Sequence, residues 1–229
     1  MSVSIQIVLS DKLYLRDPMQ TELGRNIVSA TIRMIDALGF EKFTFKKLAI
    51  EIDSTEASVY RYFKNKHKLL IYLVSWHWAW LEYLIDYQTN NIENPLERLH
   101  RAVNILSNAS TLDPDFAHID EGALHRIVLA ESSKAFLTKE VDGENEEGLF
   151  QGYKSLVGKI VEILQAINPD FKYPKALAVT AIVGTRKQLY FAEHIPSITE
   201  IKVGKNGKND AAEYMEMLIL RTLGVTDSK

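Results

Sequence analysis

The residues between positions 44 and 66 combine side-chain types that bind duplex DNA. Cations and hydroxyls can reach phosphates and the edges of bases, and small residues let a protein backbone approach a groove. We therefore expect a DNA-binding surface made by Thr44, Lys46, Thr55, Glu56, Ala57, Ser58, Tyr60, Arg61, Lys64 and Lys66.

The apolar residues of this stretch share one face of a helix. At 100° per residue, Val59, Tyr62 and Phe63 fall on one side of a helix that follows Thr55. The other side carries Ala57, Arg61 and Lys64, flanked by Ser58 and Tyr60. A recognition helix requires such an exposed face, although an ordinary helical hairpin with a solvated charged face has the same periodicity.

The elements that must position this surface have recognisable starts. Thr44 is a suitable N-cap for a short helix, and Asp53 and the residue after it form a turn. Thr55 caps a third helix that we expect to run to about Phe63. Asn65 caps a fourth helix. Two helices joined by a tight turn form the unit in which the second helix enters the major groove.

The segment before these helices begins with a short arm. Residues 3–9 alternate between apolar and polar, and residues 13–15 are again strand-like, which predicts a short hairpin or an extended arm. Thr21 then precedes apolar residues at spacings of three and four, and Gly39 ends the pattern. This predicts a helix over 21–38.

The rest of the chain is predicted to be helical. Residues 69–87 are apolar nearly all round, and interruptions such as His77 and Glu82 favour a buried helix of a soluble protein over a membrane span. Proline and glycine residues divide the remainder into helices at about 95–109, 119–138, 146–167, 174–194 and 209–223. No strand ladder is evident after residue 20, so we predict an all-α fold.

Charge is distributed unevenly along the chain. Nine basic and six acidic residues lie between Met19 and Leu70, a net charge of +3, so the remainder carries −6 of the total of −3. This asymmetry suits one DNA-facing module on a larger body. The chain has no cysteine and its N-terminus does not read as a signal peptide, so we expect a cytoplasmic protein without disulfides or thiolate zinc sites.

Several spaced features of the first seventy residues occur together. They are Gly39-Phe40, the helix start at Thr44, Leu48-Ala49, the turn ending at Thr55, the block Val59-Tyr60-Arg61-Tyr62-Phe63, and Asn65-Lys66 with Leu69-Leu70. This combination resembles the N-terminal signature of the tetracycline-repressor (TetR) family. The resemblance covers about 50 of 229 residues and is far more specific than a single short motif.

The resemblance implies roles for the matching positions. Thr44, Tyr60 and Lys66 would contact phosphates, and the region Glu56, Ala57, Ser58 and Arg61 would read base edges, with Leu48, Val59 and Phe63 in the core. Three features depart from the family's usual pattern: Asp53 stands where glycine is frequent, Glu56 where a basic or small residue is more usual, and the N-terminal arm is long. Because the arm has only two basic residues, we expect packing by the arm in preference to minor-groove binding.

The resemblance also implies a C-terminal helical domain that binds a small molecule and forms a homodimer. The family's usual pocket directs attention to Trp76, Trp80, Tyr83, His100, His125 and Tyr153, although aromatic residues at helical spacing mainly fill cores. Helices near 174–194 and 209–223 resemble the family's dimerising pair. Their predicted apolar surface is Leu177, Ile182, Leu189, Met217, Leu218 and Leu220.

Other chemistry is weakly represented. Glu121 and His125 lie one helical turn apart, with His118 and Asp120 nearby, but this spacing is also that of ordinary solvated or ion-paired side chains. No catalytic constellation, phosphate loop, metal site or cofactor site is predicted.

These observations lead to one expectation and one alternative. We expect an N-terminal arm over 1–20, a helix-turn-helix DNA-binding domain over 21–66 and a helical ligand-binding and dimerisation domain over 67–229. The expected function is a ligand-responsive regulator of transcription that is not an enzyme and does not bind membranes, a repressor by analogy with the family. The alternative is a helical small-molecule-binding or catalytic protein whose helix-turn-helix no longer binds DNA. The operator, the effector and the regulated genes are not specified by the sequence.

Overall fold

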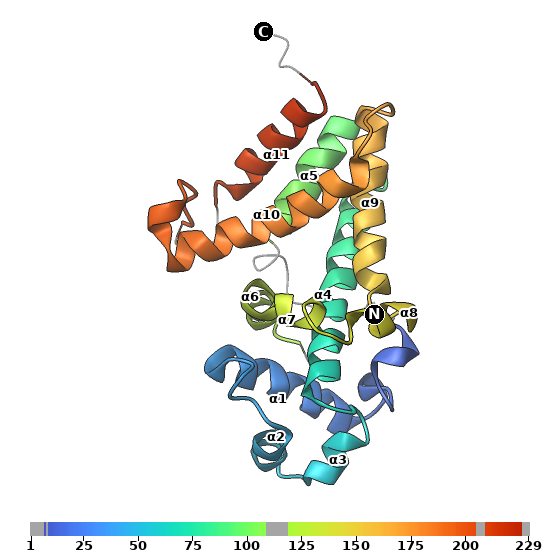
Figure 1. Ribbon diagram of the computed structural model, residues 1–229, viewed down its shortest axis with the longest axis vertical. Helices are drawn as coiled ribbons and strands as arrows, with labels where there is room; N and C mark the ends of the chain where they lie inside the picture. Colours follow the sequence, from blue (N-terminus) through green and yellow to red (C-terminus); the bar gives the residue numbers. More distant parts are fainter. Residues whose placement is uncertain (1–6, 8, 109–118, 205–208, 226–229) are drawn as a thin grey trace. The chain divides into compact units, whose positions relative to one another are not determined.

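The computed structural model describes residue 7 and residues 9–108, 119–204 and 209–225, and the secondary structure of these residues is helical (Figure 1). Their one β-type pairing is an isolated bridge between Val203 and Asn209. The predicted all-α fold is confirmed.

The chain forms two compact units. The first comprises residues 1–79 and 113–153, and the second comprises residues 80–112 and 154–229. The division at residues 20 and 66 that the sequence suggests is based on expected role, and it stays a prediction.

The first unit is built around the N-terminal helices. Its elements are η1 (Asp11–Leu13), η2 (Pro18–Gln20), α1 (Glu22–Leu38), α2 (Phe45–Glu51), α3 (Glu56–Tyr60), α6 (Glu121–Glu131), α7 (Ser133–Phe136) and α8 (Val141–Glu146), with the first part of α4 (Lys66–Thr89) and the start of α9 (Gln151–Ile167). The Thr21 hydroxyl accepts a hydrogen bond from the backbone N–H of Gly24, and Gly39, at φ 77°, ends α1. The predicted first helix is therefore confirmed.

Three predicted helix boundaries differ from the structure. The third helix ends at Tyr60 instead of about Phe63, because the N–H of Tyr62 turns back to the carbonyl of Val59 at 2.9 Å. The predicted helix over 119–138 is divided at Ser132, where backbone hydrogen bonding changes to a three-residue spacing. The predicted helix over 146–167 begins only at Gln151, after Gly148 takes a left-handed conformation at φ 81°.

The N-terminal arm does not form the predicted strand at residues 13–15. Residues 11–13 form a 3₁₀ turn, in which the Ser10 hydroxyl accepts from the N–H of Lys12 and the Leu13 side chain is only 2% exposed. Local capping and burial have replaced the extended conformation that the apolar run favoured. Residues 3–6 and 8 of the predicted hairpin lie outside the described residues.

The second unit contains α5 (Pro95–Asn108), α10 (Pro174–His194), η4 (Pro196–Ile198) and α11 (Ala211–Thr222), with the remainder of α4 and of α9. Helix α11 packs against both α5 and α10. Tyr173 precedes Pro174 at the first position of α10, so the predicted bounds 174–194 are confirmed.

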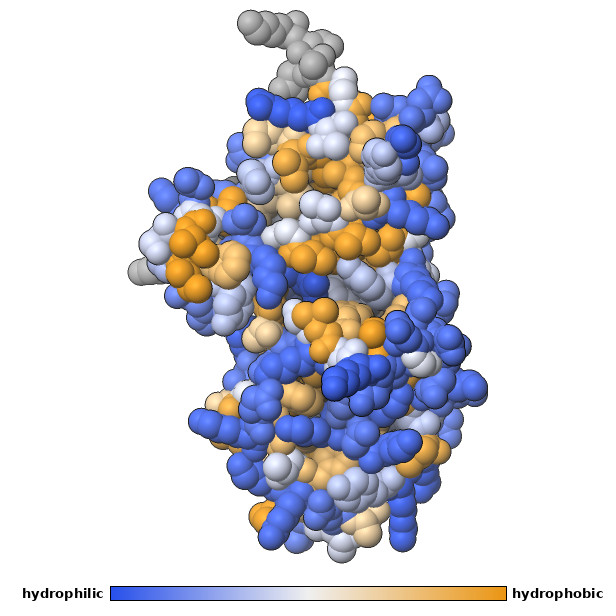
Figure 2. Space-filling model, in the orientation of Figure 1, coloured by the Kyte–Doolittle hydropathy of each residue, from blue (hydrophilic) through white to orange (hydrophobic). Residues whose placement is uncertain are grey.

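The predicted apolar surface on α10 is wrong in its residues. Leu177, Ile182 and Leu189 are at most 7% exposed, because they form the core of the second unit. The exposed apolar residues of the two helices are Val179, Val183, Tyr214 and Met217, which are 36–42% exposed. Figure 2 shows apolar side chains gathered over α10 and α11.

Candidate nucleic-acid interface

Helices α2 and α3 and the turn between them form a helix-turn-helix. The Thr44 hydroxyl caps α2 by accepting from the N–H of Lys47 at 3.2 Å, and the Thr55 hydroxyl caps α3 by accepting from the N–H of Ser58 at 3.2 Å. Between the helices, Asp53 takes a left-handed conformation at φ 49°. Aspartate tolerates this conformation better than most residues, so the chain can turn without glycine.

The inner face of this unit is apolar and buried. Leu48, Val59 and Phe63 are fully buried, as the sequence predicts for the core. The Tyr60 ring meets the Phe45 ring edge-on at 5.0 Å, although Tyr60 itself is 47% exposed. The packing therefore fixes α3 on α2 while the outer side of α3 stays open to solvent.

The structure brings the predicted DNA-contacting residues together on α2, the turn and α3. Ser58 and Lys66 are half-buried, and the others are exposed: Thr44, Lys46, Thr55, Glu56, Ala57, Tyr60, Arg61 and Lys64. Cations at Lys46, Arg61 and Lys64 can neutralise phosphates, and the small side chain of Ala57 lets the backbone of α3 approach a groove. The Glu56 carboxylate on the same helix can accept from cytosine, at an electrostatic cost near phosphates.

Lys66 has a structural role that the sequence does not reveal. Its ammonium group donates to the backbone carbonyls of Phe40, Glu41 and Phe43 at 3.2, 3.4 and 3.5 Å. It also lies 4.6 Å from the centre of the Phe40 ring. Lys66 therefore joins the start of α4 to the loop between α1 and α2, and a phosphate contact from the same group stays a prediction.

The six residues predicted to line a ligand pocket are divided between the two compact units. Trp76, His125 and Tyr153 belong to the first unit, and Trp80, Tyr83 and His100 belong to the second. The exposed ring of His100 accepts or donates a 2.8 Å hydrogen bond with Glu216 of α11, so this residue lines no enclosed site.

Within the first unit, His125 and Tyr153 belong to one chain of aromatic rings. The His125 ring lies 5.5 Å from His77, which lies 5.6 Å from Trp78, and Trp78 lies 5.1 Å from Tyr153. The crevice beside this chain leaves no space for a water-sized molecule, and its lining is Ile71, Val74, Ser75, Trp78, Ala135, Phe136, Phe150 and Tyr153. Trp78 is the link that the sequence analysis missed, since a buried tryptophan in an apolar helix has no distinguishing pattern.

Metal binding has no geometric support in the described part of the chain, where no three His, Asp or Glu side chains are grouped as ligands. Asp120, one of the residues considered for such a site, caps α6 by accepting from the N–H of Ala123 at 2.8 Å. His118 lies outside the described residues.

The family comparison now has a structural counterpart. Residues 27–73, from within α1 to within α4, match the family model described as bacterial regulatory proteins, tetR family. This is a TetR-family N-terminal domain. The resemblance inferred from residues 39–70 is therefore confirmed, and the matched segment contains the whole helix-turn-helix.

Solved structures similar to this chain are TetR-type regulators along their full length. A regulatory protein of the tetR family from Rhodococcus RHA1 is 16% identical with a TM-score of 0.60, covering 90% of this chain and 97% of that chain. The fatty acid degradation regulator FadR from Bacillus halodurans is 17% identical with a TM-score of 0.58, covering 88% and 98%. AibR in complex with isovaleryl coenzyme A and operator DNA is 17% identical with a TM-score of 0.56, covering 86% and 97%. At these identities the likeness shows a shared fold.

No curated protein matches this sequence. Among the described residues, no helix combines the length and the apolar character that a membrane crossing needs. The TetR-type domain is thus the part of the chain for which sequence and structure give the same family.

Proposed function

We propose that this chain is a regulator of transcription that binds operator DNA through α2 and α3 and responds to a small molecule. One observation carries the proposal: the helix-turn-helix buries its apolar face completely and leaves Lys46, Arg61 and Lys64 exposed together. A DNA-binding unit of this kind crosses the backbone with its first helix and reads the major groove with its second.

The contacts divide by chemistry. Thr44, Tyr60 and Lys66 are proposed to bind phosphates, which position the domain on the duplex. Arg61 is proposed to read guanine, because a guanidinium can donate two hydrogen bonds to that base in the major groove. Glu56, Ala57 and Ser58 would complete the base-reading side of α3.

We propose that the active form is a homodimer made by α10 and α11. The exposed apolar side chains Val179, Val183, Tyr214 and Met217 supply the surface, in place of the buried leucines that the sequence suggested. In such a dimer the two α3 helices would read successive turns of the major groove, roughly 34–36 Å apart.

A small-molecule effector and a repressor role complete the proposal. The solved structure of AibR holds both isovaleryl coenzyme A and operator DNA, and FadR is described as a regulator of fatty acid degradation. Acyl thioesters are therefore the first effector class to test. The closed crevice beside Trp78 and Tyr153 implies that an effector in the first unit would have to separate packed side chains.

A selection from random duplexes tests DNA binding without knowledge of the operator. The wild-type chain should enrich a palindromic motif whose half-sites are about 10–11 base pairs apart, centre to centre, or a multiple of that spacing. Failure to enrich any motif would contradict the proposal and favour the alternative, a helical small-molecule-binding or catalytic protein that does not bind DNA.

Sedimentation equilibrium tests the dimer. Val183→Glu and Met217→Glu should each shift the chain towards monomer, because a charge on an apolar interface loses its solvation there. Leu137→Glu is the matched control, since Leu137 is 83% exposed and lies outside α10 and α11. A wild-type monomer at micromolar concentration, or equal effects of all three substitutions, would contradict the proposed interface.

Native mass spectrometry tests the effector. The purified protein should retain or bind a small molecule, and adding that molecule should release the selected duplex. A molecule that binds and leaves DNA affinity unchanged would contradict its role as effector, and one that tightens DNA binding would contradict the repressor mechanism.

A further inference from the structure

The N-terminal arm packs against the end of the recognition helix. The backbone N–H of Leu15 donates to the carbonyl of Tyr62, two residues after α3, at 2.8 Å. Leu13 is buried, and the Tyr14 ring meets the Tyr72 ring of α4 edge-on at 6.2 Å. Residues 13–15 therefore contact both the end of α3 and the first part of α4.

Contacts with α1 hold the other end of the arm. The carboxylate of Asp17 accepts from the N–H of Met19 at 2.9 Å, and the Arg25 guanidinium donates to the carbonyl of Met19 at 2.8 Å. Pro18 lies so close to Gly24 that an added Cβ at position 24 would fall 2.6 Å from the Pro18 Cα atom. Only glycine fits at position 24, so the arm has a fixed path across α1.

Tyr62 is the point where arm, α1 and recognition helix meet. Its side chain is 2% exposed, and its hydroxyl lies 2.7 Å from the hydroxyl of Thr21, the residue that caps α1. Its backbone accepts the hydrogen bond from Leu15. Tyr62 therefore provides a rigid aromatic platform directly after α3.

Arg16 lies on this platform with its side chain exposed. Its guanidinium carbon is 5.5 Å from the centre of the Tyr62 ring, a distance at which a cation is attracted to the ring face. Stacking restricts the long side chain, so less freedom is lost when the guanidinium binds a further group. The planar guanidinium matches a phosphate with two parallel hydrogen bonds.

We propose that Arg16 is an additional contact to the DNA backbone, held by Tyr62 beside the end of the recognition helix. The proposal rests on the proposed DNA-binding function. Arg61 and Lys64 flank Tyr62 in the chain and are exposed, so Arg16 extends the same run of positive charge. The arm thus binds a phosphate while packed on the domain and need not enter the minor groove.

Salt-dependent DNA binding of arm variants tests this proposal. The probe is a fluorescent 30-base-pair duplex carrying the motif that the wild-type chain enriches, with a scrambled duplex for comparison. Arg16→Gln should lower the slope of log affinity against log salt concentration by about 0.9, the value for one phosphate contact, and weaken binding to both duplexes by a similar factor. Arg16→Lys should keep the wild-type slope, because it keeps the charge.

Lys12→Gln is the matched control. Lys12 is an exposed cation of the same arm that is not stacked on Tyr62, so its removal should leave the slope unchanged. An unchanged slope for Arg16→Gln, or equal losses for Arg16→Gln and Lys12→Gln, would overturn the proposal while the wild-type chain still binds its motif. A wild-type chain that binds no duplex selectively would overturn the proposed function and this contact together. Thermal unfolding of each variant verifies that the arm substitutions leave the domain folded.

Discussion

Arg126 of α6 forms a two-pronged ion pair with Asp36 of α1: its Nε atom lies 2.9 Å from one carboxylate oxygen and its Nη2 atom 2.6 Å from the other. Both side chains belong to the first compact unit. This geometry connects α6 directly to the first helix of the TetR-type domain.

A double-mutant cycle measures that connection. Asp36→Asn and Arg126→Gln should each lower the free energy of unfolding, with a coupling energy of about 0.2–1 kcal/mol, because the pair is largely solvated. The coupling should shrink as salt is added. Urea unfolding of the four proteins gives the value, and a coupling energy of zero at low salt would mean that the pair does not stabilise the unit.

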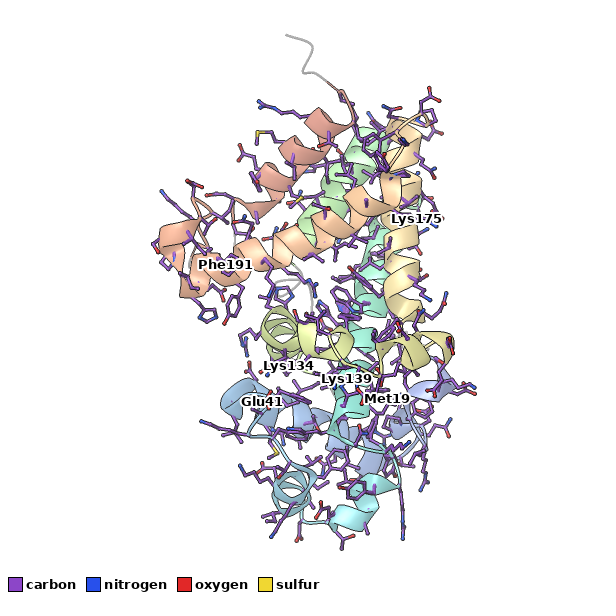
Figure 3. All side chains as sticks on the ribbon, viewed as in Figure 1. Met19, Glu41, Lys134, Lys139, Lys175 and Phe191 are labelled. Atoms are coloured by element: carbon purple, nitrogen blue, oxygen red, sulfur yellow. The ribbon has the colours of Figure 1, made fainter. Side chains whose placement is uncertain are left out.

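Lys134 of α7 forms a second connection, which predicts a dependence on pH (Figure 3). Its ammonium lies 2.7 Å from a Glu41 oxygen and 2.8 Å from a Glu131 oxygen. The hydrogen bond from Lys134 holds the pKa of Glu41 below its ordinary value of 4.5, and the hydrogen bonds to Glu131 and Glu41 hold the pKa of Lys134 above its ordinary value of 10.5.

The stabilisation should therefore be present at neutral pH and lost at both extremes. A lowered carboxyl pKa stabilises the fold above the ordinary value and loses this effect as pH falls through the lowered pKa; a raised ammonium pKa stabilises below its ordinary value and loses the effect as pH rises through the raised one. The melting-temperature difference between wild type and Lys134→Met should be constant between about pH 5 and pH 10 and shrink outside that window. Lys139→Met is the control, and a difference that persists unchanged at pH 3 would argue against the ion pairs.

The turn residue Asp53 predicts a contrast between two substitutions. A β-branched residue in the left-handed conformation is strained, so Asp53→Val should lower the free energy of unfolding by about 1–2 kcal/mol. Asp53→Gly should change it by less than about 1 kcal/mol, because relief of strain and loss of chain entropy oppose each other.

Chemical denaturation of both variants checks this contrast. Asp170→Val is the comparison, since Asp170 is exposed and does not have positive φ. Similar losses for Asp53→Val and Asp170→Val would show that the backbone conformation at position 53 costs nothing.

The sequence predicted those parts of the domain that local patterns determine. Thr21 and Gly39 specify the ends of α1, and the spacing of Leu48, Val59 and Phe63 specifies the buried face of α2 and α3. The early end of α3 was not predictable, because the hydrogen bond that Tyr62 accepts from Leu15 joins residues distant in sequence.

The same reason explains what sequence missed at the site. Nothing near Lys66 in the chain indicates that its ammonium would meet three carbonyls of the loop after α1. Likewise, His125 and Tyr153 join one row of rings only because His77 and Trp78 lie between them in space. Long-range packing decides these contacts, and periodicity contains no information about it.

Lys66 gives a prediction that separates structural and DNA-binding roles. Lys66→Met should lower the free energy of unfolding by about 1–3 kcal/mol, because charged hydrogen bonds to the loop carbonyls are lost. Lys64→Met, at an exposed position, should have little effect. If Lys66 also contacts a phosphate as proposed, the salt slope of DNA binding should fall by about 0.9; a stable Lys66→Met variant would contradict the structural role.

Fluorescence anisotropy of Arg61→Ala on the selected duplex tests the central claim most directly. The proposal predicts that the wild-type chain binds this duplex more tightly than a scrambled one, and that Arg61→Ala loses about 1–3 kcal/mol of that preference while Lys139→Ala, at an exposed cation outside α2 and α3, keeps it. Equal affinity of the wild-type chain for both duplexes, or an Arg61→Ala variant with undiminished preference, would contradict recognition of DNA through α3.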